Sequence, residues 1–181
     1  INGCLVGSEM CIRDSNHSII NVPDKRLITL QEIVNPEKLI PATVEIVDIA
    51  GLVKGASKGE GLGNKFLANI RETDAIIHVL RCFDNDNITH VDGSVDPIRD
   101  KEIIDIELQL KDLESLNNRL EKVSRTVKSG DKEAAREKEV LNQAISFIES
   151  SNNIRSIDLD EDDINKYLMP LQLITSKPVL Y

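Results

Sequence analysis

The sequence predicts an α/β domain that is interrupted by a helical hairpin. Residues 43–48 are rich in β-branched side chains, and residues 75–80 form an uninterrupted apolar run, so we expect two strands, the second buried and parallel to a neighbour. Between residues 97 and 152, apolar residues recur at spacings of three, four and seven, as is typical of helices. Residues 177–181 begin a third strand. Strands that alternate with helices favour a layered α/β fold.

The composition of the 181-residue chain limits the classes of function. Hydrophobic residues make up 40% and charged residues 29%, which is enough to build a packed core. The formal net charge of −9 disfavours general binding to DNA, because contacts with phosphates dominate that affinity. No apolar run approaches the roughly 20 residues that cross a membrane. Cys4, Cys11 and Cys82 lack metal-ligand spacing, so we expect a reduced, cytoplasmic protein.

Capping residues mark the expected helices. A short amphipathic helix is expected from Asp24 to Ile33, and another helix over residues 62–72. Asp96 and Pro97 are a typical helix start, and Asp131 can cap a second long helix. The first long helix should carry a heptad seam of Ile103, Ile106, Leu110, Leu113, Leu120, Val123 and Val127. The second should bury Ala134, Leu141, Ala144, Ile145 and Ile148.

The two ends of the chain give weaker signals. Residues 1–20 show no clear period. A short, acidic helix is expected to begin near Asp160, and Pro170 should end or kink it.

The pattern with the clearest chemistry follows the strand 43–48. This strand ends in Asp48, and Gly51 follows three residues later. An apolar strand that ends in Asp-x-x-Gly is the switch II signature of P-loop nucleotide hydrolases. The carboxylate can hold Mg²⁺, commonly through a water, and the glycine N–H can approach a γ-phosphate where a side chain would collide. Four residues also match by chance, and an ordinary turn at a strand end is the alternative.

A longer context favours the switch. Residues 48–64 and 66–75 closely resemble the switch II region of the Obg-like ATPases of YchF type, which are P-loop hydrolases of the Obg family. Residues 22–27 resemble the segment that precedes this region in the family, and residues 81–83 and 85–91 resemble the segment that follows it. The resemblance covers about residues 21–181. It implies an incomplete G-domain sheet with helices, interrupted by an antiparallel coiled-coil insert. Residues 21–96 and 174–181 would then form the partial G domain and residues 97–173 the insert, while residues 1–20 are a segment foreign to the family or an artefact.

The resemblance also implies a function. Such a protein hydrolyses ATP or GTP with Mg²⁺ and is associated with ribosomes or translation. Asp48, Ala50 and Gly51 would contact the nucleotide, with Asp48 holding the metal. Leu52 stands where many related hydrolases place a glutamine that orients the attacking water. Since leucine cannot do this, we expect slow hydrolysis, or help from another polar group or a K⁺-like cation.

The phosphate-binding motif Gly-x-x-x-x-Gly-Lys-Ser/Thr does not occur in the 181 residues. We therefore expect a truncated piece of a nucleotide hydrolase that is inactive alone. The alternative is a helical docking module that works without hydrolysis.

Other residues near the switch leave two interpretations open. Lys54, Lys58, Lys65 and Arg71 either face phosphate or ribosomal RNA, or belong to a solvated loop. His78 lies in an apolar strand, where a structural role is favoured over a catalytic one.

Overall fold

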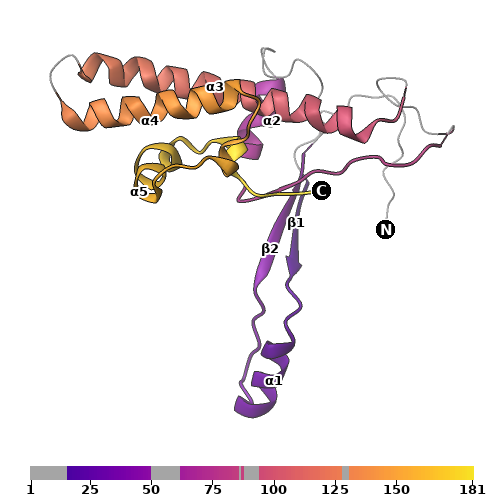
Figure 1. The fold of residues 1–181 in the computed structure, drawn as a ribbon. Coiled ribbons are helices and arrows are strands. Elements are labelled where there is room, and N and C mark those ends of the chain that lie inside the picture. The colour runs from indigo at the N-terminus through magenta and orange to yellow at the C-terminus, as the bar shows by residue number, and fades with distance from the viewer. Residues whose placement is uncertain (1–15, 50–61, 86, 88–93, 128–130) are drawn as a thin grey trace. The chain divides into compact units, whose positions relative to one another are not determined.

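The computed structural model describes residues 16–49, 62–85, 87, 94–127 and 131–181. The chain divides into two compact units, residues 1–50 and 51–181 (Figure 1). The described part of the first unit contains β1 (Asn16–Asn21), α1 (Lys25–Val34) and β2 (Thr43–Asp48). The described part of the second contains α2 (Leu62–Arg71), β3 (Ile76–Ile77), α3 (Pro97–Val127), α4 (Lys132–Glu149), η1 (Ile154–Ser156), α5 (Glu161–Asp163), η2 (Ile164–Leu168), η3 (Met169–Leu171), η4 (Ile174–Ser176) and β4 (Val179–Leu180).

β1 and β2 form an antiparallel pair in the first unit. Asn16 lies opposite Asp48, and Asn21 lies opposite Thr43. β2 has the predicted bounds, since its β-branched side chains favour extended backbone. β1 is absent from the predicted elements because its sequence, Asn-His-Ser-Ile-Ile-Asn, lacks an alternation of polar and apolar residues. The pairing places Asp48 at the end of the hairpin opposite α1 (Figure 1).

α1 fills the connection between these strands. The side chain of Asp24 accepts a hydrogen bond from the backbone N–H of Arg26 (2.9 Å), so Asp24 is the N-cap and the helix begins close to the expected position. The helix ends at Asn35, whose φ of 46° lies in the left-handed region that asparagine tolerates. Both ends therefore follow from local chemistry.

The described part of the first unit has no core. No side chain over residues 17–49 is buried, and Ile19 and Ile33 are 72% and 74% exposed. A strand pair of this size gains little stability by itself, because it needs a further layer to cover its apolar side chains.

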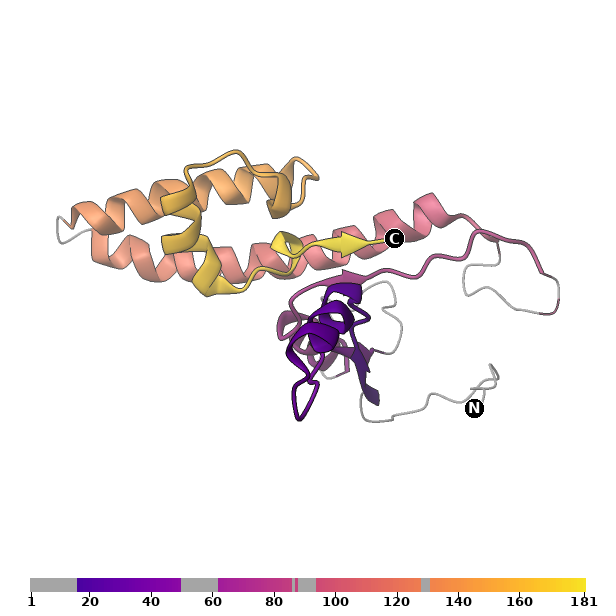
Figure 2. The ribbon, with the colours of Figure 1, turned by 90° about the horizontal axis from the view of Figure 1, so that it is seen from below.

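The core of the described residues lies in the second unit. α3 and α4 run side by side as an antiparallel helical hairpin, and the segment 154–173 folds back beside them (Figures 1 and 2). Asp131 caps α4 by accepting hydrogen bonds from the backbone N–H groups of Glu133 (2.8 Å) and Ala134 (3.3 Å), as predicted. The core residues are Leu116, Val123, Ala134, Val140, Leu141, Ala144, Ile145, Ile148, Ile154, Tyr167, Leu168 and Leu173. All five residues of the stripe predicted for α4 are among them.

The seam predicted for α3 is correct only where α3 meets α4. Its core-packed members are Leu113, Leu120, Val123 and Val127. Ile106 and Leu110 are instead 51% and 37% exposed. α3 has 31 residues and α4 has 18, so the earlier half of α3 packs against η4. There the buried face is formed by Leu108 and Asp112.

The segment after α4 is an irregular helical run. The carboxylate of Asp160 accepts a hydrogen bond from the backbone N–H of Asp162 (2.9 Å), so α5 begins where predicted. The run continues as a π-helix, η2, which buries its neighbouring residues Tyr167 and Leu168. Pro170 lies in η3, the tight turn that ends this helical run.

β3 and β4 form a parallel pair, with Ile76 opposite Val179 and Ile77 opposite Leu180. The parallel pairing is as predicted, but the burial is wrong: Ile77 and Val79 are 59% and 87% exposed. The sheet is too small to bury these side chains, because among the described residues it has two strands of two residues each. None of the helices that the structure describes is both long and apolar enough to cross a membrane.

Candidate functional site

Asp48 is the predicted site residue that the structure describes. It is the last residue of β2, and its side chain is exposed. No hydrogen bond or ion pair to this side chain is found within the described ranges. Ala50, Gly51 and Leu52 lie outside those ranges, so the structure does not test whether these residues meet. The carboxylate of Asp48 is available to a ligand.

The other carboxylate of β2 is already engaged. Glu45 Oε1 lies 2.6 Å from Nδ1 of His17 on β1, so this side chain holds the two strands together. Asp48 and Glu45 thus differ in their partners although both are exposed on one strand. This contrast makes Glu45 a suitable control for experiments on Asp48.

The chemistry of Asp48 fits a magnesium ion that is shared with a nucleotide. No group of three or more His, Cys, Asp or Glu side chains able to hold a metal occurs in the described part of the chain. Mg²⁺ does not need such a group, because it commonly takes one or two carboxylates and fills its remaining positions with waters and phosphate oxygens. One exposed carboxylate at a strand end matches that pattern.

A buried carboxylate, Asp112, was not predicted. Its side chain is 0% exposed and accepts hydrogen bonds from the backbone N–H groups of Ile174 (2.9 Å) and Thr175 (2.7 Å). Burial raises the pKa of Asp112, although these hydrogen bonds and the charge of Arg71 act to lower it. A sequence signal existed: Asp112 stands four residues from both Leu108 and Leu116, in the middle of a buried stripe.

Arg71 matches neither of its two open interpretations, because its side chain contacts a neighbouring helix. Its Nη2 donates a hydrogen bond to Oγ of Ser115 on α3 (2.9 Å), so it faces a helix and not a solvated loop. Lys54, Lys58 and the side chain of Lys65 lie outside the described residues.

His78 is half-buried at the end of β3. Its ring centroid lies 5.8 Å from that of Tyr181. Burial lowers the pKa of His78; the charge of Asp105 acts to raise this pKa, and the charge of Lys101 acts to lower it further. This packing agrees with a structural role.

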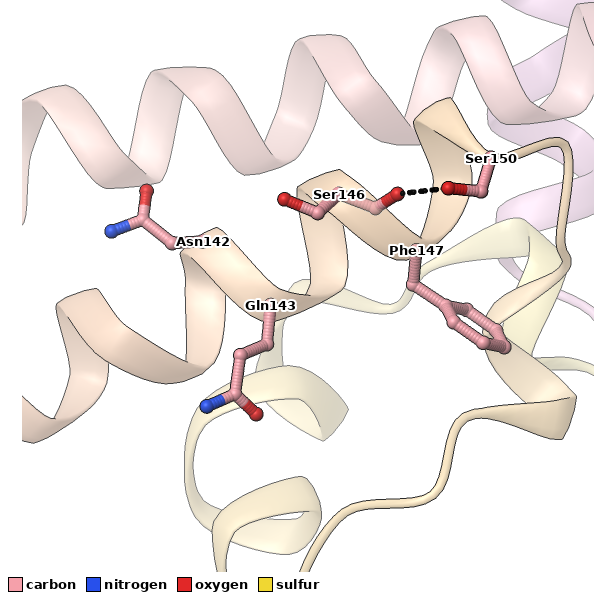
Figure 3. Close-up of a pocket in the computed structure, with 5 residues that line it drawn as sticks. All are labelled: Asn142, Gln143, Ser146, Phe147 and Ser150. Carbon is pink, nitrogen blue, oxygen red and sulfur yellow. Dashed lines mark hydrogen bonds between the residues drawn. The ribbon is translucent and has the colours of Figure 1, made fainter.

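A surface hollow of about 460 Å³ lies along α4 (Figure 3). It is lined by Asn142, Gln143, Ser146, Phe147 and Ser150. Four of them come from α4 and Ser150 is its C-cap, and none is an acid or base that could activate a serine hydroxyl.

Comparisons with known proteins identify the family. The model of the 50S ribosome-binding GTPase family matches residues 11–122. This range includes residues 11–20, which the sequence alone assigns to a foreign segment.

Individual relatives give the same result. The chain is 50% identical to the ribosome-binding ATPase YchF of Haemophilus ducreyi and 52% identical to that of Bacillus subtilis, over 171 residues in each case. These matches cover 94% of the chain but 47% and 46% of the relatives, so the chain spans about half the length of the curated relatives it matches.

A solved structure agrees in fold. The YchF GTPase of Schizosaccharomyces pombe matches with a TM-score of 0.76 and 38% identity, over 94% of this chain and 47% of that one. The predicted resemblance to YchF-type hydrolases and the α/β fold class are confirmed, whereas truncation stays a prediction. The chain belongs to the 50S ribosome-binding GTPase family, with the fold of a P-loop GTPase domain.

Proposed function

We propose that the intact protein binds ATP or GTP together with Mg²⁺, hydrolyses it, and works in association with ribosomes. The relatives are named ribosome-binding ATPases, which supports the activity and the partner. The observation that carries the proposal is the position of Asp48. Its exposed carboxylate ends β2 immediately before the Ile-Ala-Gly sequence that completes the switch signature.

We assign separate roles to the residues of this signature. Asp48 holds the metal through a water, because its exposed oxygens face no competing donor among the described residues. Ala50 and Gly51 lie beside the terminal phosphate, where a backbone N–H contacts it closely only if no side chain intervenes. Bound Mg²⁺ supplies neutralisation of the phosphate charge.

Leu52 is the reason to expect slow nucleotide hydrolysis. A leucine side chain has no polar atom, so it cannot orient the attacking water through a hydrogen bond. Intrinsic turnover is therefore low, or a different polar group or a K⁺ ion supplies the missing stabilisation.

The domain division is part of the same proposal. Residues 21–96 and 174–181 belong to the G domain, and residues 97–173 form a coiled-coil insert that docks on the ribosome. Of residues 1–20, the stretch from residue 11 onward lies within the family match. Support for the docking role comes from the hairpin of α3 and α4, which has a core of its own that includes Leu116 and Leu141. The same observation favours the alternative, a docking module that works without hydrolysis.

The test uses two neighbouring carboxylates in the full-length protein. Asp48→Asn should abolish magnesium-dependent hydrolysis of ATP and GTP, while Glu45→Gln on the same strand should retain it. Hydrolysis is measured as phosphate release with and without Mg²⁺. If Asp48→Asn hydrolysed nucleotide as fast as the unchanged protein, the switch assignment would be wrong and the docking alternative would remain.

A further inference from the structure

α2 connects the switch region to the helical hairpin. It begins at Leu62, directly after the residues that carry Gly51, and it ends at Arg71 beside α3. Arg71 Nη2 donates to Oγ of Ser115 (2.9 Å), and the same hydroxyl lies 3.2 Å from the carbonyl oxygen of Lys111. Because a hydroxyl has one proton, its donation to Lys111 leaves the lone pairs to accept from Arg71. This geometry fixes the end of α2 against one turn of α3.

The same turn of α3 is fixed to η4. Asp112, one turn before Ser115, accepts hydrogen bonds from Ile174 and from both donors of Thr175. Lys177, the residue directly after η4, donates a hydrogen bond through Nζ to the backbone oxygen of Thr73, two residues after the end of α2. α2, α3 and η4 therefore form a closed set of contacts, which we call the α2–α3–η4 junction; its members are Arg71, Thr73, Asp112, Ser115, Thr175 and Lys177.

The junction lies partway along α3, and the remainder of the helical hairpin extends away from it. α3 continues from Ser115 to Val127, which at about 1.5 Å per residue is about 18 Å. Over this length α3 and α4 share a close-packed core. Packed helices move as bodies and deform little, so a rotation at the junction displaces the far end of the hairpin.

We propose that Arg71 is a positioning residue that couples α2 to the hairpin, so that a nucleotide-dependent movement of α2 carries the hairpin with it. This inference rests on the proposed nucleotide response at Asp48 and Gly51. The hydrogen bond from Arg71 to Ser115 joins α2 to α3 directly, whereas Lys177 joins the end of α2 to η4. Without the bond to Ser115, α2 is held to α3 less firmly, so less of its movement reaches the hairpin.

Distances between spin labels in the full-length protein test the coupling. One pair joins Asn69→Cys on α2 to Lys132→Cys on α4, and the other joins Ser18→Cys on β1 to Lys132→Cys; the native cysteines are replaced by serine. All three label positions are exposed. Each pair is measured with Mg–ADP and with a non-hydrolysable ATP or GTP analogue. In the unchanged protein, the 69–132 distance should be the same in both states and the 18–132 distance should shift.

Removal of the hydrogen bond between Arg71 and Ser115 should change both distances. Arg71→Ala and Ser115→Ala should each broaden the 69–132 distances and remove most of the 18–132 shift, and the double variant should behave like either single one. Ser115→Ala removes only a hydroxyl, so this variant breaks the link with little disturbance of the fold. Arg125→Ala is the matched control, because this exposed arginine bonds Glu121 within α3.

The outcomes distinguish the two proposals. A full 18–132 shift in Arg71→Ala and Ser115→Ala overturns the coupling. If the unchanged protein binds and hydrolyses nucleotide but shows no shift, the coupling is overturned and the proposed function stands. If it neither binds nor hydrolyses nucleotide, both fall.

Discussion

Thr175 directs both of its hydrogen-bond donors, the backbone N–H and the hydroxyl, at the same carboxylate oxygen of Asp112, each at 2.7 Å. The other oxygen accepts from the backbone N–H of Ile174. Asp112 is fully buried, so its interactions replace water and are stronger than hydrogen bonds between neutral groups. The site supplies three donors, and it requires an acceptor-only side chain.

Asp112→Asn should therefore destabilise the protein. Asparagine replaces one acceptor oxygen by an NH₂ group, so at least one buried donor faces another donor. We expect the free energy of unfolding to fall by about 2 kcal/mol, as for a buried group that loses its partner. Urea denaturation measures this. Asp131→Asn is the control and should change little, since asparagine caps helices as well as aspartate. Equal stability of the two variants would contradict the assignment.

His78 should make stability depend on pH. Burial lowers the pKa of His78 from its ordinary value of 6.5. The unfolded chain then takes up a proton at a higher pH than the folded protein, so stability falls as pH falls below 6.5. Asp105 opposes this effect and Lys101 adds to it. Urea denaturation between about pH 5 and 8 should show a weaker dependence in His78→Gln. The same slope in both proteins would exclude this role.

The two units should differ in local stability. β1, α1 and β2 lack buried side chains over residues 17–49, whereas α3 and α4 share the core. Amide hydrogen exchange of the 181-residue chain should therefore be fast in the first unit and slow in the hairpin. Mass spectrometry of exchanged peptides gives both rates in one sample. Equal protection of β2 and α4, or one sharp two-state melt, would contradict this expectation.

The 181-residue chain should bind nucleotide negligibly. It contains no Gly-x-x-x-x-Gly-Lys-Ser/Thr motif, and the backbone N–H groups of that loop supply most of the contacts with phosphates. Titration calorimetry with Mg–ATP and Mg–GTP should show no heat of binding, with the full-length protein as the positive control. Micromolar binding by the 181 residues would show that another phosphate site exists.

Leu52→Gln in the full-length protein should raise turnover. Glutamine restores a polar group that can orient the attacking water. Single-turnover hydrolysis measures the chemical step without product release. Leu52→Met is the control because it changes shape without adding a hydrogen bond of similar strength. Unchanged turnover in Leu52→Gln would mean that water orientation does not limit the reaction.

The sequence predicts elements well where their cause is local. Asp24, Asp131 and Asp160 mark helix starts because a capping side chain bonds the backbone two or three residues later. The exposure of Ile106 and Leu110 could not be predicted in this way. Their environment depends on η4, which is more than sixty residues away in the chain, as the separation of Asp112 from Thr175 shows.

The residues of the candidate site could likewise be predicted only where the cause is local in the sequence. Asp48 could be predicted because the strand and its final carboxylate are adjacent in the sequence. The role of Asp112 could not be predicted, because the spacing of Leu108 and Leu116 indicates a buried position but its partners come from a distant turn. Arg71 likewise finds Ser115 on another helix, 44 residues away.

The wide turn of η2 limits how this part of the chain can change length during evolution. Tyr167 and Leu168 are consecutive, yet both are buried, at 8% and 3% exposure. Deletion of a single residue from this turn would restore the ordinary helical pitch and rotate every later side chain by about 100°. Leu168 would then leave the core, so insertions and deletions should be rare between Ile164 and Leu168 and easier to accommodate in exposed turns.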